Sequence, residues 1–282
     1  MKFKILIIAF SVIIVMVIAV IIMLPSIFAG TQAAGADVVS KIRLMTLPML
    51  IFMVVLLVGM GIFFFFNYRL LSLLEREDWP ALAYYLEQKC FTKGQYTNRN
   101  VRLLASSYLV LTDYASVLKL ESKTMLANSS AVGKNILLFG TARILSGNYK
   151  DAAAFYKTYL DKGKLSRKEQ QWTRFFYGFS FLLSGAFKLS QPEFTSLAIS
   201  SNDGIITGLS AYFLNKTIAR YVDNTAGCVA ASESGRSRVL KALKKSASWK
   251  KEAAKLGSDI HVAIIKRYID ETGDWLYAAA SE

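Results

Sequence analysis

The side chains that could carry out catalysis are few in this chain, and they lie far apart in the sequence. There is one histidine, His261, and there are two cysteines, Cys90 and Cys228. Their spacing is unlike that of a metal site or a CxxC redox pair, and no residue near His261 offers a nucleophile for it to activate. We therefore expect a packed or surface histidine, two reduced and buried cysteines, and neither a metal nor any other cofactor.

Two short segments look like catalytic or nucleotide-binding motifs but do not match them. The segment SAVGKN at 130–135 suggests a phosphate loop, yet Asn128 stands where that loop needs a glycine, and Asn135 stands where it needs a metal-binding hydroxyl. The segment GLSAY at 208–212 lacks the second glycine of a nucleophile elbow and follows no strand. The sequence therefore predicts a protein that is not an enzyme and binds no nucleotide.

Two long apolar runs near the N-terminus, residues 5–24 and 44–66, carry no charge. A helix rises about 1.5 Å per residue, so each run is long enough to cross a hydrocarbon core of roughly 30 Å. Because only a helix satisfies its own backbone in lipid, we expect two transmembrane helices and a membrane anchor over 1–66. An alternative interpretation of residues 1–29 is a cleaved signal peptide.

The charges indicate the side of the membrane on which the rest of the chain lies. Four of the 34 basic and one of the 20 acidic residues fall in positions 1–66, so the remainder carries a net charge of +11. Basic residues favour the cytoplasmic side. More of them flank the expected inner side than the short loop: Lys2, Lys4, Arg69 and Arg76 against Lys41 and Arg43. We expect an integral protein of the inner or plasma membrane with a cytoplasmic C-terminal domain; the alternative is an extracytoplasmic domain.

One phrase of sequence occurs twice, 38 residues apart: FGTARILSGNYK begins at Phe139 and YGFSFLLSGAFK at Tyr177. Its apolar spacing predicts a helix, Gly147 supplies the left-handed residue that ends it, and a second helix follows. Aromatic residues recur after turns at spacings of 35, 35 and 38: Trp79, Tyr114, Tyr149 and Phe187. Such a period indicates stacked units, none of which can bury its apolar face alone.

These units resemble the tetratricopeptide repeat (TPR) family, whose helix pairs have small residues at the helix crossing and an aromatic residue after the turn. Gly140 and Ala152 take the small positions, and we expect Tyr149 to fill the space beside them. The likeness is best over one segment and extends to three others: 133–163, then 98–130, 68–91 and 172–200. The resemblance implies an α-solenoid of helix-turn-helix pairs.

The chain departs from that family in three ways. No proline closes a unit, Arg143 and Phe181 stand where tyrosine is frequent, and Pro192 is expected to start a displaced helix. No strand-like alternation follows residue 67, so we expect an all-α protein. Its expected parts after the anchor are TPR-like repeats, a small polar loop and basic C-terminal helices: 67–221, 222–237 and 238–282, with the last part forming helices at 238–256 and 259–271.

The resemblance implies that the first helix of each pair lines a concave groove. The groove residues would be cations and small polar side chains at one end and aromatic side chains at the other: Arg99, Arg102, Ser106, Lys134, Thr141, Trp172, Phe175 and Phe179. Such a groove could hold an acidic or carboxylate-ended peptide through charge-assisted hydrogen bonds. The alternative is a set of solvated cations and core aromatics.

A second candidate surface is the basic stretch 236–267, which contains ten basic and two acidic residues. Trp249 lies about 180° from the apolar face of the expected helix, among lysines. We expect the surface to contact anionic lipid or an acidic partner rather than nucleic acid. Its residues are Lys244, Lys245, Trp249, Lys250 and Lys251. The alternative is a solvated outer helix with Trp249 tucked under a neighbour.

These features together predict a non-enzymatic, membrane-anchored scaffold or adaptor that binds partner proteins through a helical surface, within a larger membrane complex. An alternative is an extracytoplasmic structural component of an envelope-bound machine of the motility or secretion type. A third interpretation is a membrane enzyme, which is disfavoured because neither apolar run contains an ionisable residue.

Overall fold

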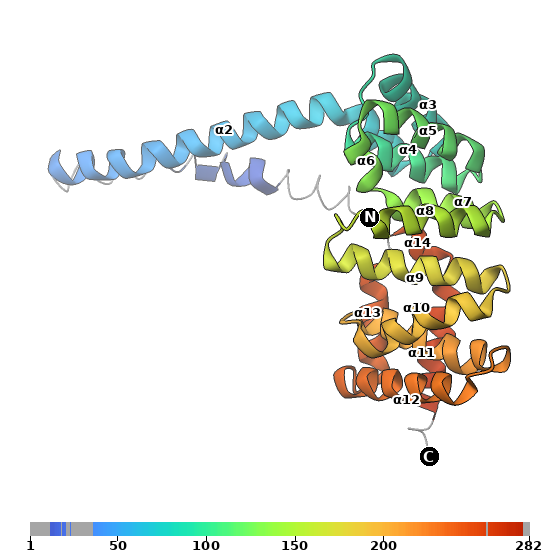
Figure 1. The fold of residues 1–282 in the computed structure, drawn as a ribbon. Helices are drawn as coiled ribbons and strands as arrows, with labels where there is room; N and C mark the ends of the chain where they lie inside the picture. Colours follow the sequence, from blue (N-terminus) through green and yellow to red (C-terminus); the bar gives the residue numbers. More distant parts are fainter. Residues whose placement is uncertain (1–11, 18, 21–22, 24–35, 258, 279–282) are drawn as a thin grey trace. The chain divides into compact units, whose positions relative to one another are not determined.

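The computed structural model describes residues 12–17, 19–20, 23, 36–257 and 259–278, and only the backbone of 36–47 and 49–50. From residue 36 onward the described elements are helices and none is a strand (Figure 1), which confirms the all-α prediction for this part of the chain. In chain order they are α2 (Ala36–Glu75), α3 (Trp79–Glu87), a π-helix (Gln88–Thr92), α4 (Asn98–Val110), α5 (Tyr114–Ala127), α6 (Ser129–Gly133), α7 (Ile136–Leu145), α8 (Tyr149–Asp161), α9 (Arg167–Leu183), α10 (Phe187–Ser200), α11 (Gly204–Lys216), a 3₁₀ turn (Ile218–Arg220), α12 (Thr225–Ala242), α13 (Ser246–Leu256), α14 (Ile260–Ala263) and α15 (Lys266–Tyr277).

The chain divides into two compact units, Met1–Tyr85 and Leu86–Glu282. In the first unit, α2 runs without a break through the apolar run at 44–66 and through Pro48. Among the described residues, Ile51–Glu75 is the one helix long and apolar enough to cross a membrane, and its most apolar stretch is not buried. The other expected span, 5–24, lies largely outside the described residues.

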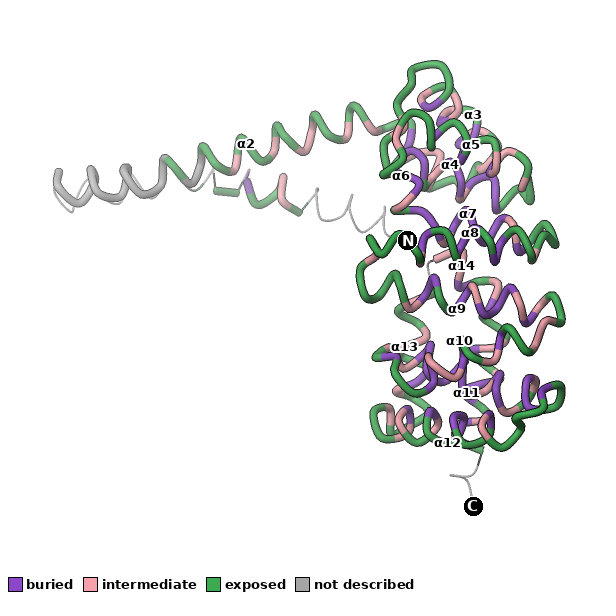
Figure 2. The backbone as a smooth tube through the Cα atoms, viewed as in Figure 1, coloured by how far each residue is buried: buried purple, intermediate pink, exposed green. Residues whose placement is uncertain are grey.

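In the second unit, consecutive helices pack against one another along the chain. α4 contacts α5, α7 contacts α8, α9 contacts both α8 and α10, and α11 contacts α10 and α12. Figure 1 shows α7 to α12 lying one after another, and Figure 2 shows that buried and exposed residues alternate along each of them. The C-terminal helices do not extend this series, because α14 contacts α7 and α15 contacts α11.

Four turns between helices share one geometry. In each turn, the residue two positions before the aromatic residue has a positive φ: Glu77 (53°), Thr112 (57°), Gly147 (78°) and Gly185 (76°). In each, the next N–H donates to the carbonyl five positions earlier: Asp78 to Leu73 at 3.2 Å, and Asp113 to Tyr108, Asn148 to Arg143 and Ala186 to Phe181 at 2.9 Å. This is the Schellman arrangement, in which one left-handed residue ends a helix. The four aromatic residues therefore each begin a helix, as their period predicts: Trp79 (α3), Tyr114 (α5), Tyr149 (α8) and Phe187 (α10).

The helices α7 and α8 come close together at Gly140. A Cβ atom at this position would lie 2.1 Å from Cζ of Tyr156, whose side chain is fully buried. A small residue is thus required here, as the sequence predicts. The ring that fills the space is Tyr156, however, and not Tyr149, which begins α8 seven residues earlier and is half-buried.

Residues 222–237 do not form the expected loop, because most of them belong to α12. The small side chains that suggest a loop instead let α12 lie close to its neighbours. A Cβ atom on Gly235 would lie 3.0 Å from Cβ of Ala211 and 3.2 Å from that of Ala198. Ser232 Oγ donates to the Ala211 carbonyl at 2.8 Å, and the Asn224 side chain caps the helix by accepting from the Gly227 N–H.

Two further helix boundaries differ from expectation. Pro192 does not displace a helix, since α10 runs through it and buries Phe194 and Leu197 beyond it; this packing outweighs the one backbone donor that proline lacks. The expected helix at 238–256 is broken at Leu243, which leaves the helical region at φ −118° and ψ 72°. The break lets α13 turn back onto α11 and α15, so that it buries Trp249.

Candidate functional site

The first helices of the pairs would offer one face, the inner face, to a partner. The C-terminal helices of the same chain cover this inner face. The His261 ring lies 5.8 Å from the Trp172 ring and 5.9 Å from the Phe176 ring. Further along, the Tyr268 ring lies 5.8 Å from Phe179 and 5.1 Å from Phe213. The chain itself therefore occupies the expected groove.

The prediction that aromatic side chains line an open end of this groove is therefore wrong. Trp172, Phe175 and Phe179 are buried, because they pack into an aromatic core that the C-terminal helices close. Thr141, at the other end, is buried as well. At the cationic end, Arg102 forms an ion pair with Asp259 at 2.9 Å. The remaining residues stay accessible, with Arg99 and Lys134 exposed and Ser106 half-buried.

His261 is a packed residue. Burial among the aromatic rings lowers its pKa from 6.5 to about 4; Asp259 opposes this shift, and the positive charges of Arg102 and Lys168 add to it. The imidazole is therefore neutral at physiological pH. Its ring contacts are with Trp172 and Phe176, which makes it a structural contact between α9 and α14.

The cysteines are buried, free thiols, as expected. Burial raises the pKa of the Cys90 thiol to about 11 and also raises the pKa of Cys228. A thiol with a raised pKa is a poor nucleophile because little thiolate forms. The described residues contain no group of three or more His, Cys, Asp or Glu side chains placed to hold a metal ion.

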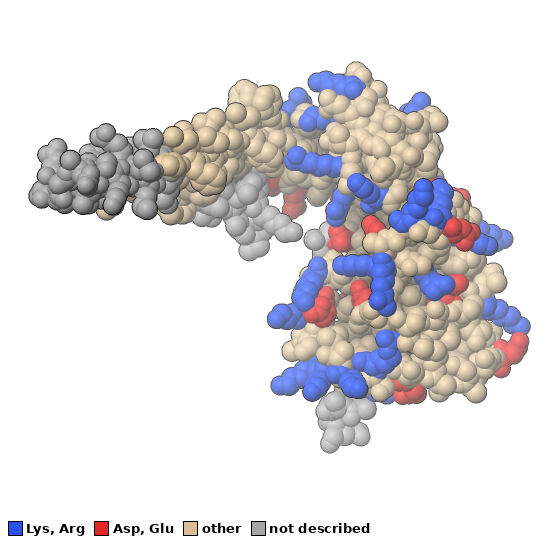
Figure 3. Space-filling view, turned by 60° about the vertical axis from the view of Figure 1, so that its left-hand side comes forward, with Lys and Arg blue, Asp and Glu red and all other residues tan. Residues whose placement is uncertain are grey.

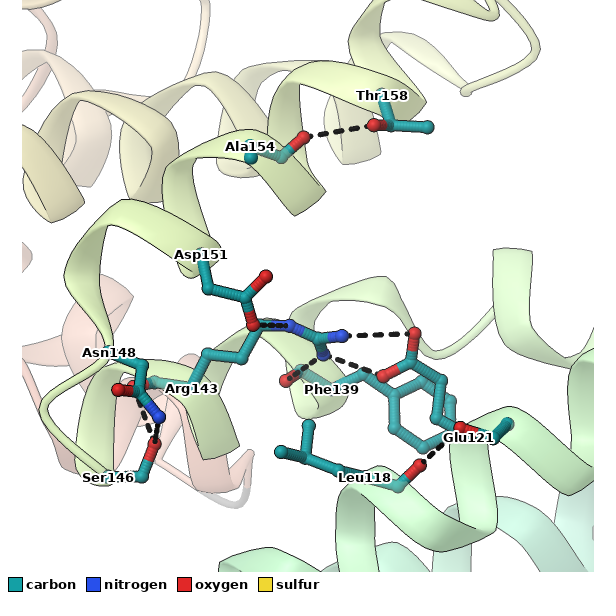
Figure 4. Close-up of polar contacts among 10 residues, drawn as sticks. Leu118, Glu121, Phe139, Arg143, Ser146, Asn148, Asp151, Ala154 and Thr158 are labelled. Carbon is teal, nitrogen blue, oxygen red and sulfur yellow. Dashed lines mark hydrogen bonds and ion pairs between the residues drawn. The ribbon is translucent and has the colours of Figure 1, made fainter.

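Arg143, which stands where tyrosine is frequent in the TPR family that the sequence resembles, has a structural role in this fold. Its guanidinium group donates to both carboxylate oxygens of Glu121 at 2.6 and 3.3 Å and to Asp151 at 2.8 Å (Figure 4). It also lies 4.2 Å from the centroid of the Phe155 ring. The Arg143 and Glu121 side chains are only 12% and 11% exposed. This cation therefore joins α5, α7 and α8.

A basic pocket of about 1070 Å³ lies between the start of α9, the turn from α10 to α11, the end of α12 and the end of α13. Its cations come from three helices: Arg167 and Lys168 from α9, Arg238 and Lys241 from α12, and Lys255 from α13. Its two acidic side chains are Asp203 and Glu252. Lys and Arg side chains also extend along the face of the second unit, the body (Leu86–Glu282), that Figure 3 draws.

Some of these cations are held in place and others are available. Arg238 donates to the carbonyls of Ala198 at 2.8 Å and Ser201 at 2.7 Å, so it caps the end of α10. Lys255 pairs with Glu252 at 2.5 Å. By contrast, Lys168 and Lys241 are exposed and form no ion pair with the described residues. The pocket therefore presents positive charge that the surrounding chain does not neutralise.

The helix starts at the pocket are already capped. The Asp203 carboxylate accepts from the N–H groups of Ile205 at 2.9 Å and Ile206 at 3.2 Å. At the start of α9, Ser166 and Glu169 form a reciprocal capping box. The backbone donors that often bind phosphate at a helix start are consequently in use.

The expected lipid-facing surface is only partly exposed. Lys244, Lys245, Lys250 and Lys251 are exposed, but Trp249 is only 2% exposed, so the prediction that it stands among the lysines is wrong. The reason is the break at Leu243, which rotates α13 and places the indole against Gly208 and Gly273. The sequence does not predict the pocket, because the segments that supply its cations, 167–171 and 238–256, are distant in the chain. The one local signal is the capping box at 166–169, which marks the start of α9.

The fold and these sites define a protein whose described part is all-helical, with consecutive helices packed against one another, one candidate membrane-spanning helix, and a basic pocket in its body. The family described as "Uncharacterised Treponema protein" matches residues 116–278, more than half of the chain, and the chain belongs to this family. The matched residues contain the basic pocket and the covered inner face, but not α2.

A curated relative from Treponema pallidum (strain Nichols), named "Uncharacterized protein", is 31% identical over 153 residues. The alignment covers 54% of this chain and 48% of the relative, so the chain spans about half the length of the curated relative it matches. No solved structure matches the chain.

Proposed function

We propose that this protein is a non-enzymatic, membrane-anchored scaffold whose helical body binds other proteins. The observation that carries the proposal is the common geometry of the four turns at Glu77, Thr112, Gly147 and Gly185. Equal turns at a near-constant spacing favour a TPR-like stack of helix pairs, because each pair presents the same kind of surface to its neighbour. Repeat stacks of this type hold extended binding surfaces in a fixed shape.

The apolar helix Ile51–Glu75 supports the anchor. At about 1.5 Å per residue its 25 residues extend about 37 Å, more than the roughly 30 Å of a hydrocarbon core. Large apolar side chains on it are solvent-exposed, including Phe65 at 80% and Phe66 at 73%. Exposed apolar side chains in such a helix favour a lipid environment over water. An anchor of this kind raises the concentration of the body near its membrane-bound partners.

The cytoplasmic side is the proposed location of the body. Native cysteines are unsuited to report on this because both are buried. An introduced thiol at the exposed residue Lys157 on α8 serves instead, in the full chain. We expect Lys157→Cys to resist a membrane-impermeant maleimide in intact cells and to react after permeabilisation. Reaction in intact cells would move the body to the extracytoplasmic side.

Partner binding is tested by purifying the full chain in a mild detergent after in-cell cross-linking, with quantitative mass spectrometry. The control is the same membrane expressing only residues 1–85, which retains the candidate span. The proposal predicts at least one protein enriched with the full chain and not with the control. Equal recovery of every protein from the two samples would reject a scaffold function of the body.

A further inference from the structure

We propose that the basic pocket binds an acidic, amphipathic polypeptide segment of a partner protein, an inference that rests on the scaffold function proposed above. The pocket is defined by its five cations, Arg167, Lys168, Arg238, Lys241 and Lys255, and by the apolar side chains between them. The expected groove on the inner face cannot serve this purpose, since the helices α14 and α15 fill it.

The charges of the pocket require a negative ligand. Five cations face two acids, and both acids are engaged: Asp203 caps α11 and Glu252 pairs with Lys255. Lys168 and Lys241 come from different helices and have no ion-pair partner in the described residues. Because Lys168 belongs to α9 and Lys241 to α12, these two cations can attract successive carboxylates along an extended or helical segment.

The apolar lining requires a ligand that also has apolar side chains. Ile205, Val239, Leu243 and Leu256 line the pocket, and Leu243 and Leu256 are only half-buried. These two leucines leave apolar surface that a purely ionic ligand would not cover. Leucine or phenylalanine side chains on one face of a partner segment would bury it, as in other grooves that receive an amphipathic helix.

The size and the caps of the pocket disfavour a small phosphate-bearing ligand. Its volume of about 1070 Å³ is at the upper limit of small-molecule sites, which measure roughly 300–1,000 Å³. The Asp203 carboxylate already occupies the N–H groups at the start of α11, where it would repel a phosphate. The guanidinium group of Arg238 donates to the carbonyls of Ala198 and Ser201, so these N–H groups are not available to a phosphate.

The direct test measures binding of a defined peptide to the full chain in nanodiscs of neutral lipid. The probe is a fluorescein-labelled helical peptide of Glu, Leu and Ala with its leucines on one face, followed by fluorescence anisotropy. We expect saturable binding that weakens as salt is raised. We expect the double variant Lys168→Glu, Lys241→Glu to bind the peptide about tenfold or more weakly, because both replaced charges face the ligand.

The matched control is Lys150→Glu, Lys157→Glu on α8, which makes the same change in net charge at exposed positions outside the pocket. It should lower the affinity less than threefold, and both double variants should keep the wild-type circular dichroism and melting temperature. An equal loss in the two variants would overturn the proposal, since net charge alone would explain it. Unchanged binding by the pocket variant would overturn it too.

Two competitors separate the proposed ligand from other anions. Inorganic phosphate should displace the peptide no better than sodium chloride at the same ionic strength. Vesicles of phosphatidylglycerol should displace it no better than vesicles of neutral lipid. Displacement by either at low concentration, lost in the pocket variant, would reassign the pocket to phosphate or lipid headgroups. A peptide with Gln in place of every Glu should not bind, and a peptide with its leucines scattered around the helix should bind more weakly than the original probe. Equal binding of the original probe and these two peptides would also overturn the proposal.

Failure of this inference is distinguishable from failure of the scaffold function. If the pocket variant recovers the same partner proteins from cells as the wild type, the pocket is not the contact, whereas the scaffold function stands. If no protein is enriched with the full chain over residues 1–85, the scaffold function fails, whatever the peptide measurement gives.

Discussion

The indole of Trp249 lies directly against the backbone of Gly208. A Cβ atom on Gly208 would be 2.7 Å from Cη2 of Trp249, and a Cβ atom on Gly273 would be 2.8 Å from its Nε1. The indole N–H donates to the Ile269 carbonyl at 3.2 Å. One tryptophan of the basic C-terminal stretch is thus enclosed between α11 and α15, and it ties the covering helices to the stack.

We expect Gly208→Ala to destabilise the protein by about 1–3 kcal/mol, because the added methyl group overlaps an indole enclosed on both sides. Gly133→Ala is the matched control, since a Cβ atom there would meet no atom within 4 Å and Gly133 has no positive φ. It should be neutral or stabilising by up to about 1 kcal/mol. Urea unfolding of the two variants measures the difference, and similar midpoints would show that Trp249 is not seated here.

The left-handed residue Thr112 gives a second prediction. A β-branched residue at φ 57° is strained, whereas glycine at the equivalent positions Gly147 and Gly185 is not. Thr112→Gly should therefore raise the free energy of unfolding by about 1 kcal/mol, despite the greater entropy of glycine in the unfolded chain. Gly147→Ala should lower it by a similar amount. A destabilised Thr112→Gly variant would argue against the shared turn geometry.

The ion pair of Arg143 with Glu121 is largely buried, so replacing one partner leaves an uncompensated charge. Arg143→Met should cost about 3 kcal/mol, and the double variant Arg143→Met, Glu121→Leu should recover part of the loss. The comparison is Lys188→Met, which breaks the fully exposed pair Lys188–Asp223 and should leave the melting temperature nearly unchanged. Equal effects at the two pairs, measured by thermal unfolding, would contradict the burial of Arg143.

The stability of the body should depend on pH through His261. Its folded-state pKa of about 4 lies below its ordinary value of 6.5, so the unfolded chain takes up the proton first. The contribution is complete above pH 6.5 and is lost as the pH falls towards 4, at a slope that approaches about 1.4 kcal/mol per pH unit. Denaturant unfolding from pH 7.5 to 5 should show this loss in the wild type and less of it in His261→Gln. Parallel profiles would place His261 in water.

Sequence patterns predict local features of this fold well and its long-range contacts poorly. The aromatic residues Trp79, Tyr114, Tyr149 and Phe187 mark helix starts because a left-handed residue and a short turn precede each of them, which is information held within a few positions. The loop predicted at 222–237 fails because the same small residues suit a loop and a close helix contact. Only the positions of Ala198 and Ala211, fixed by the fold, favour the helix.

The candidate sites follow the same division. Arg102 lies on α4, as predicted for a first helix, whereas Lys134 lies in the turn between α6 and α7. The basic stretch 236–267 supplies three of the cations of the pocket, Arg238, Lys241 and Lys255. The sequence does not reveal that α14 and α15 return to cover the inner face, since this depends on the turn at Leu243 and on contacts more than 80 residues apart, such as that of His261 with Trp172.

The most direct test of partner binding through the basic pocket is photo-cross-linking in intact cells. A photoreactive amino acid is placed in the full chain either at Lys241 in the pocket or at Lys157 on α8. We predict a protein adduct from position 241 that is absent from position 157, with the cross-link mapping to an acidic, leucine-containing segment of the partner. Adducts with lipid alone, or the same protein adducts from both positions, would contradict this prediction.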